Sequence, residues 1–220
     1  MTSQSLTALR RTESSATMRG RYLQSIVMSV VLALGWSTAA AAQLMLTPIV
    51  GAYVPTGNVY EQPGTIGTAR QGTSFAFGGR LMYSASGRLG IEVGVTYAPS
   101  KVEIITATQT VSRSAHLWLG QLRLVYVLNS EWAPINIYAA AGAGVVSRGG
   151  EAYDGVTGLT DLTGNLAFGA LFRVGSSYRI RLEIEDYLYK TQMTFPSGES
   201  SGSRFQNDFV FSFGLSIPLG

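Results

Sequence analysis

The feature that most constrains this chain is a two-residue alternation of bulky apolar side chains with small or charged ones. It is clearest over residues 89–97, LGIEVGVTY, where the aliphatic residues and Tyr97 share one face and Glu92 lies on the other. Residues 209–217, FVFSFGLSI, repeat the pattern. Successive side chains of a strand point to opposite faces, so a period of two predicts β-strands. We therefore expect an all-β fold.

The composition of the two faces fits an inside-out barrel, and the N-terminal segment and the loop lengths described below decide which face points outward. Hydrophobic residues make up 46% of the 220-residue chain, charged residues only 13%, and 26 residues are glycine. One face is uniformly bulky, whereas the other mixes Gly, Ser and Thr with a few charges. Bulky groups suit lipid and small groups fit a narrow barrel interior. Residues 43–220 contain no apolar run long enough for a transmembrane helix. A membrane barrel is therefore expected.

Eight segments carry the strand pattern, and the connections between them alternate in length. The segments are 44–57, 73–83, 88–104, 113–128, 135–147, 162–175, 178–192 and 207–219. Short connections at 84–87, 129–134 and 175–177 alternate with longer, polar ones at 58–72, 105–112, 148–161 and 193–206. This predicts an eight-stranded antiparallel up-and-down transmembrane β-barrel over 43–220, with both termini in the periplasm of a Gram-negative cell.

The N-terminal segment has the features of a secretory signal. A basic stretch precedes the apolar run of residues 23–42, which ends in three alanines. A charged region, an apolar core and small residues are typical of a cleaved signal peptide. We predict that residues 1–42 are removed and that the mature chain begins at Gln43; translation from Met18 would give a leader of ordinary length. The alternative is an uncleaved membrane anchor.

The net charge of +3 does not indicate nucleic-acid binding. The leader contains four of the 16 basic residues and one of the 13 acidic residues, so 12 of each remain after cleavage. No basic stripe interleaved with aromatic residues is present. Cysteine is absent, which excludes disulfides and thiolate chemistry.

Three segments resemble the small outer-membrane barrels of the OmpA/OmpX-like class, the outer membrane protein beta-barrel domain proteins. They are PIVGAYVPTG at 48–57, YAAAGAG at 138–144 and RLEIEDY at 181–187. The resemblance spans nearly the whole mature chain and implies the barrel architecture. One departure concerns the C-terminus, which reads Ile217-Pro-Leu-Gly220 instead of ending in an aromatic residue. The barrel assembly machinery would then recognise Phe211 and Phe213, or this lineage would carry a different signal.

The face opposite the bulky residues collects ionisable groups, which we expect to fill the barrel lumen. They are Arg80, Glu92, Gln121, Arg123, Arg173, Arg181, Glu183 and Glu185. Charges inside a membrane protein pair with one another or line water. The favoured interpretation is a structural polar network that plugs the lumen. The alternative is a narrow pore for ions or small solutes.

Two further patterns concern the outer surface. Aromatic residues near the segment ends resemble interfacial girdles: Tyr53, Tyr83, Tyr97, Trp118, Tyr126, Trp132, Tyr187 and Tyr189. Asp186 falls on the lipid-facing phase of its segment, which predicts a bulge or a position at the membrane interface.

The sequence offers little support for catalysis. His116 is the only histidine, with Ser114 and Trp118 as neighbours on its face. A nucleophilic site needs three convergent groups, and a lone histidine is a poor metal site. We predict no enzymatic activity, no metal and no cofactor. A barrel enzyme that modifies lipid A is the second alternative.

The expected role is therefore structural, with contacts made at the cell surface. Alternation continues through 102–111, VEIITATQTV, so the third and fourth strands are expected to extend above the bilayer as a hairpin. An exposed strand edge there would bind an extracellular partner by strand addition. The alternative is a flexible loop rich in threonine. The other expected partners are outer-membrane lipid, lipopolysaccharide and the assembly machinery, and the barrel is expected to be a monomer.

Overall fold

The computed structural model describes residues 43–61, 67–84, 87–106, 109–130, 133–175, 177–196, 198 and 200–219. The predicted signal peptide and the alternative start at Met18 lie outside these residues. In the described part of the chain, no helix has the length and hydropathy needed to span a membrane.

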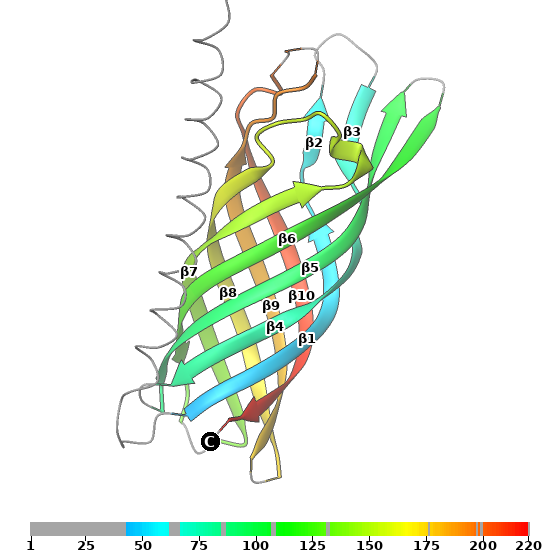
Figure 1. The fold of residues 1–220 in the computed structure, drawn as a ribbon. Coiled ribbons are helices and arrows are strands. Elements are labelled where there is room, and N and C mark those ends of the chain that lie inside the picture. Colours follow the sequence, from blue (N-terminus) through cyan, green and yellow to red (C-terminus); the bar gives the residue numbers. More distant parts are fainter. Residues whose placement is uncertain are drawn as a thin grey trace, which may run out of the picture. The chain divides into compact units, whose positions relative to one another are not determined.

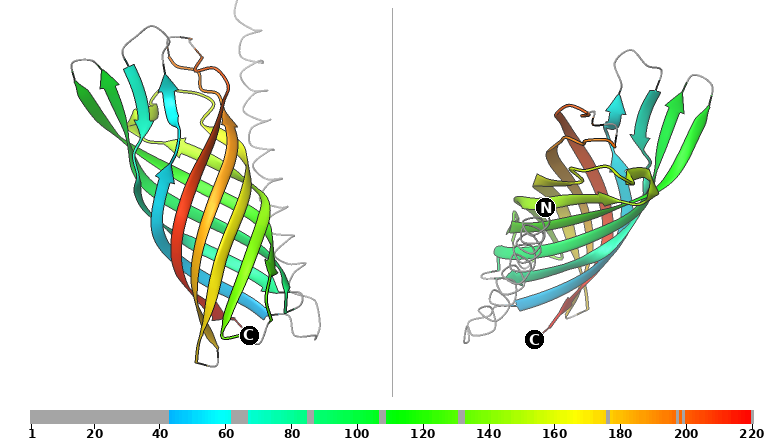
Figure 2. Two further views of the ribbon diagram at one scale, coloured as in Figure 1. Left: turned by 180° about the vertical axis from the view of Figure 1, so that it is seen from behind. Right: turned by 45° about the horizontal axis from the view of Figure 1, so that its top comes forward.

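Eight antiparallel strands close into a barrel, as predicted (Figure 1). They are β1 (Gln43–Pro55), β4 (Ser74–Ser84), β5 (Leu89–Thr106), β6 (Thr110–Val127), β7 (Ile135–Gly149), β8 (Thr160–Val174), β9 (Tyr178–Thr191) and β10 (Arg204–Pro218). Each pairs with the next, and the last strand pairs with the first, from Met45↔Pro218 to Pro55↔Asp208. Figure 2 shows β1 and β10 side by side. Closure leaves no open edge in lipid.

Two strands lie within the segment 58–72, which the sequence suggested to be a loop. They are β2 (Asn58–Glu61) and β3 (Gly67–Gln71). β3 pairs with β5 from Gly67↔Thr106 to Gln71↔Val102. β5 and β6 stay paired to Ile105↔Thr110, which confirms the predicted long hairpin. We call β2, β3 and the adjoining ends of β5 and β6 the four-stranded extension; it projects beyond the barrel (Figures 1 and 2).

Side-chain exposure confirms which face of the sheet points outward. Ile91, Leu182 and Phe211 are 46%, 44% and 46% exposed on the outer wall. Glu92 and Arg181, next to two of them in sequence, are 0% and 2% exposed. A soluble barrel would show the reverse arrangement. The apolar exterior and charged interior are those of a membrane barrel.

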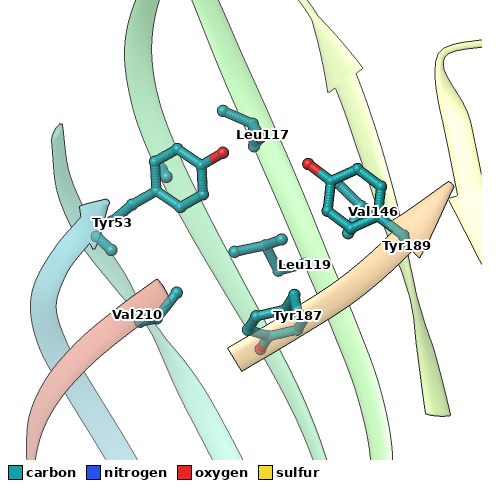
Figure 3. Close-up of a cluster of buried hydrophobic side chains, with 9 residues drawn as sticks. Tyr53, Leu117, Leu119, Val146, Tyr187, Tyr189 and Val210 are labelled. Atoms are coloured by element: carbon teal, nitrogen blue, oxygen red, sulfur yellow. The ribbon is translucent and has the colours of Figure 1, made fainter. Parts of the chain in front are cut away.

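The lumen is filled in layers, which can be followed along β6 from the short-turn end. Val125 belongs to an apolar cluster at the mouth, and Arg123 with Gln121 forms the charged layer above it. Leu119 and Leu117 come next, in an apolar layer shown in Figure 3. Tyr53, Tyr187, Tyr189, Val146 and Val210 complete that layer, with Ala76 and Ala98.

The long connections form a cap over the upper end of the lumen. A short 3-10 helix (Glu151–Tyr153) follows β7 and places Tyr153 in a buried cluster with Val102, Ala115 and Met193. The hydroxyl of Tyr153 donates to Gln71 Oε1 of β3 at 2.7 Å. Thr157 and Thr194 exchange backbone hydrogen bonds, which link the connection after β7 to the one after β9. We call this assembly the cap.

Candidate functional site

The polar residues predicted to share the lumen converge at mid-barrel, with one exception. Arg80 on β4, Glu92 on β5, Arg123 on β6 and the β9 carboxylates are buried together with Arg181 and Gln121. Three arginines face three glutamates, so the set is electrically balanced. We call it the charged network. Burying ions is costly unless each is paired and hydrogen-bonded, so the individual contacts decide whether it stabilises the barrel.

Arg123 forms hydrogen bonds with two of the three carboxylates and lies 3.8 Å from the third, that of Glu185. Its Nε donates to Glu92 Oε1 at 2.9 Å, and its Nη2 lies 2.7 Å from both carboxylate oxygens of Glu183. Its Nη1 donates to Asn165 Oδ1 at 3.2 Å. Each guanidinium nitrogen therefore has an acceptor, and the planar fork fixes the positions of residues from three other strands.

Arg181 binds the same two carboxylates from the other side. Its Nη1 donates to Glu92 Oε2 at 2.5 Å, and its Nη2 donates to Glu183 Oε2 at 2.5 Å. Its Nε donates to the hydroxyl of Tyr138 at 2.7 Å, and that hydroxyl donates to Glu183 at 2.6 Å. Two arginines and two glutamates thus alternate around a closed arrangement of charge-assisted hydrogen bonds.

Glu185 forms the upper part of the network. The guanidinium of Arg80 binds its Oε1, and the hydroxyl of Tyr187 donates to its Oε2 at 2.6 Å. Gln121 Nε2 lies 3.3 Å from the same oxygen. All three carboxylates therefore have donors from at least two other side chains.

Glycines on the lumen face provide the space for these long side chains. A Cβ atom on Gly94 would lie 2.5 Å from Arg80 Cδ, and one on Gly169 would lie 2.3 Å from the Tyr138 hydroxyl. Gly79, on the outer wall, would meet nothing within 4 Å. The small residues predicted to fit a narrow lumen thus have defined neighbours.

Arg173 is the exception among the predicted network residues. It is exposed at the short-turn end of β8, where it lies opposite Arg179 of β9. Alternation placed it correctly on the inner face but gave no information about its height along the barrel. Tyr138, Asn165 and Tyr187 belong to the network but were not predicted.

The predicted aromatic girdle is partly wrong. Tyr53, Tyr187 and Tyr189 point into the lumen and are buried (Figure 3). Trp118 and Tyr126 do face outward, and Trp118 packs against Tyr97 with ring centroids 4.7 Å apart and ring planes tilted by 52°. Trp132 lies outside the described residues.

The two inward tyrosines near the long loops bind a buried carboxylate. Tyr53 and Tyr189 donate to Asp208 Oδ2 at 2.6 Å and 2.5 Å. Arg148 pairs with Asp161 at 2.7 Å, and its guanidinium carbon lies 4.9 Å from the Tyr189 ring centroid. These groups lie around the apolar layer, so the upper lumen is also closed.

Two other residues singled out by sequence lie on the outer wall. His116 packs beside Tyr97, with ring centroids 5.8 Å apart, and beside Gly149. Asp186 pairs in register with Phe209 and Leu166, so β9 has no bulge there. The Oδ2 atom of Asp186 accepts a hydrogen bond from Asn207 at 3.4 Å.

Among the described residues, no group of three acidic, histidine or cysteine side chains could hold a metal ion.

A cavity of about 310 Å³ opens at the short-turn end, below the charged network. Met82, Val125 and Leu171 form its apolar floor. Arg88 and the facing pair Arg173 and Arg179 lie among its lining residues. We call it the mouth cavity.

Comparison with known proteins agrees with this architecture. A family model described as outer membrane protein beta-barrel domain matches residues 28–216. No curated protein matches the chain. The crystal structure of OprG from Pseudomonas aeruginosa is 11% identical and superposes with a TM-score of 0.61, covering 81% of this chain and 96% of that one.

Two further solved structures are similar. Outer membrane protein AlkL is 16% identical with a TM-score of 0.57, covering 83% of this chain and 94% of AlkL. Outer Membrane Protein W of E. coli is 16% identical with a TM-score of 0.51, covering 82% of this chain and all of that one. At these identities the likeness shows the fold alone.

Proposed function

We propose that this chain, which belongs to the outer membrane protein beta-barrel domain family, is a sealed structural barrel whose surface extension makes contacts outside the membrane. The observation that carries the proposal is the blocked lumen. The charged network crosses it with three ion-paired arginines, and the apolar layer lies directly above. A path for ions would have to break paired charges and wet buried leucines, which favours a closed barrel over a pore.

Conductance measurements test the closed barrel. We expect purified protein in planar bilayers to give no discrete current steps, with a known porin as the positive control. Reproducible steps from the folded protein, identified by its faster gel migration before heating, would favour the narrow pore.

The four-stranded extension supports the surface role. In the described part of the chain, β7 pairs with β6 only from His116 onward, so residues 110–115 have no strand neighbour on that side. An open edge of this kind can accept an added strand from a partner. A Ser112→Pro variant would remove an edge amide, because even-numbered β6 residues direct their N–H groups to the β7 side, and should reduce partner binding while leaving the barrel folded.

We also propose that the barrel has no catalytic activity. His116, the residue on which a histidine-dependent enzyme would rely, packs against Tyr97 on the outer wall. Mass spectrometry of lipid A from a strain that overproduces the protein should show no new species. A modification that disappears in a His116→Ala variant would contradict this.

The same geometry supports the proposed orientation and partners. β1 begins and β10 ends at the short-turn end, which supports periplasmic termini. The apolar outer wall fits lipid and lipopolysaccharide around a monomer, and outward-facing Phe211 and Phe213 on β10 suit recognition by the assembly machinery. Protease added to intact cells should cut a site inserted at 107–108 and spare a C-terminal tag.

A further inference from the structure

One carboxylate lies on the lipid-facing wall, where the barrel is otherwise apolar. Asp186 shares this outward face with its strand partners, Phe209 of β10 and Leu166 of β8. Its Oδ2 accepts one long hydrogen bond, from Asn207 at 3.4 Å, and its Oδ1 has no hydrogen-bond partner. An ionisable group that faces lipid is costly and points to a functional contact. The side chain is only half-buried, so a donor can reach it from the lipid side.

A lysine lies above this carboxylate on the same face of β9. Lys190 is exposed, four residues nearer the long-loop end, and Phe205 of β10 is its direct strand partner. Leu162 of β8 lies one residue beyond the last β8–β9 pair, Thr163↔Tyr189. Phe205 and Leu162 are the most exposed large apolar side chains of the described residues, at 66% and 83%. A lysine among such groups can extend its ammonium to the phosphates at a membrane surface.

An apolar groove of about 730 Å³ lies in the outer wall below Asp186. It extends from β8 across β9 and β10 to β1, strands that lie side by side in the left view of Figure 2. Ile184, the next outward residue below Asp186, is part of its lining. The strand partners of Ile184, Phe168 and Phe211, line it as well. The groove fits an alkyl chain of any lipid, so selectivity has to come from the polar groups above it.

We propose that Lys190, Asp186 and this groove together bind the lipid A part of lipopolysaccharide. Lys190 binds a phosphate, the groove holds an acyl chain, and Asp186 accepts a hydrogen bond from the amide or hydroxyl group at the head of that chain. The order of these groups selects the lipid. The hydroxyacyl amides of lipid A carry N–H and O–H donors below the phosphate, whereas a glycerophospholipid has only ester oxygens there. The inference rests on the proposed orientation, which places the long-loop end in the outer leaflet.

Lipid titrations of the full barrel in detergent micelles, measured by native mass spectrometry, test this. The probes are lipid A and phosphatidylglycerol, which both contain phosphate, although only lipid A has donors below it. We expect wild type to bind lipid A at least about tenfold more tightly, because a hydrogen bond to a charged group contributes that much affinity. Equal affinities for the two lipids would overturn the proposal.

Two variants separate the contact with the acyl amide from the contact with the phosphate. Asp186→Leu should weaken lipid A binding at least about tenfold and leave phosphatidylglycerol binding within about twofold, although leucine adds apolar surface to the wall. Lys190→Gln should weaken the binding of both lipids. The matched control, Lys101→Gln, removes an exposed lysine from the outer face of β5 and should bind both lipids within about twofold of wild type. An Asp186→Leu variant that keeps the wild-type affinity for lipid A would overturn the proposal.

This experiment and the test of orientation fail separately. Binding in micelles does not depend on which way the barrel faces in the cell. A lost preference for lipid A would overturn the lipid A site and leave the proposed orientation standing. Cleavage of the C-terminal tag by protease added to intact cells would overturn the orientation, and with it the placement of this site in the outer leaflet.

Discussion

The two halves of the lumen are filled by different chemistry within the same wall. The charged network, nearer the short turns, consists of balanced ions that each depend on several others. The apolar layer nearer the long loops resembles the core of a soluble protein, with tyrosines that anchor one carboxylate. Loss of one ion leaves its partners buried with an unbalanced charge, whereas loss of one leucine leaves only a void. The halves should therefore respond differently to substitution.

The largest effect is expected in the charged network. An Arg123→Met variant would leave Glu92 and Glu183 with one cation fewer, and the free energy of unfolding should fall by about 3–5 kcal/mol. Urea titration in detergent micelles, followed by gel migration, measures this. Arg113→Met on the exposed extension should change it by less than about 0.5 kcal/mol. A similar effect in both variants would mean that the network contributes no special stability.

In the apolar layer, truncating a side chain should lower the free energy of unfolding without leaving an unbalanced charge. Leu119→Ala removes a fully buried side chain, whereas Leu122→Ala removes one that is 60% exposed on the outer wall. Both lose about 2 kcal/mol of transfer free energy. Lipid fills the space at residue 122, so Leu119→Ala should cost about 1–2 kcal/mol more. The same urea titration compares them, and equal losses would indicate that the layer is loosely packed.

The cap over the apolar half should be sensitive to alkaline pH. Burial raises the pKa of Tyr153 to about 12, above its usual value of 10.0. The folded cap therefore favours the neutral phenol. Its contribution to the free energy of unfolding is intact below pH 10 and decreases between pH 10 and about 12, by at most about 2.7 kcal/mol.

A Tyr153→Phe variant isolates this titration from those of the other tyrosines. The difference in free energy of unfolding between wild type and variant should be constant from pH 8 to 9.5 and should shrink above pH 10. A difference that is independent of pH up to 11.5 would show that the cap does not bury the phenol.

The smallest effect concerns the space that a glycine provides. Gly94→Ala would force the Arg80 side chain to move, because the new Cβ would lie 2.5 Å from Arg80 Cδ. We expect a loss of about 1–2 kcal/mol in the free energy of unfolding. Gly79→Ala, which meets no atom within 4 Å, should be neutral or slightly stabilising. If both behave alike, the charged network tolerates displacement of Arg80.

Alternation alone predicts the eight strands and seven residues of the charged network, because the parity of a position fixes which face it occupies. Parity also predicts the orientation of two tyrosines that were assigned to the outer girdle because of their residue type. Tyr187 and Tyr189 share their parity with Glu183 and Glu185, so they belong inside, although tyrosine is common in interfacial girdles. On the strand β9, parity was thus more reliable than residue preference.

Other features could not be read from the sequence. Parity does not give height, so Arg173 was placed with the network although it lies at the mouth. β2 and β3 are only four and five residues long and lack a bulky face, so they resemble a loop. They form strands because Gly67–Gln71 pairs with the long edge of β5, a contact between segments distant in sequence.

The pairing of β1 with β10 joins the two ends of the sequence, and the side chains of Thr47 and Ser216 are 2.8 Å apart across that seam. A chain still emerging from the translocation machinery would lack β10. The edges of β1 and β9 that pair with β10 would then be exposed and unsatisfied. Lipid offers no hydrogen bonds to such edges, so insertion has to wait for the final fifteen residues of β10. Truncated polypeptides are then excluded from the membrane, and the seam acts as a proofreading step on full-length synthesis.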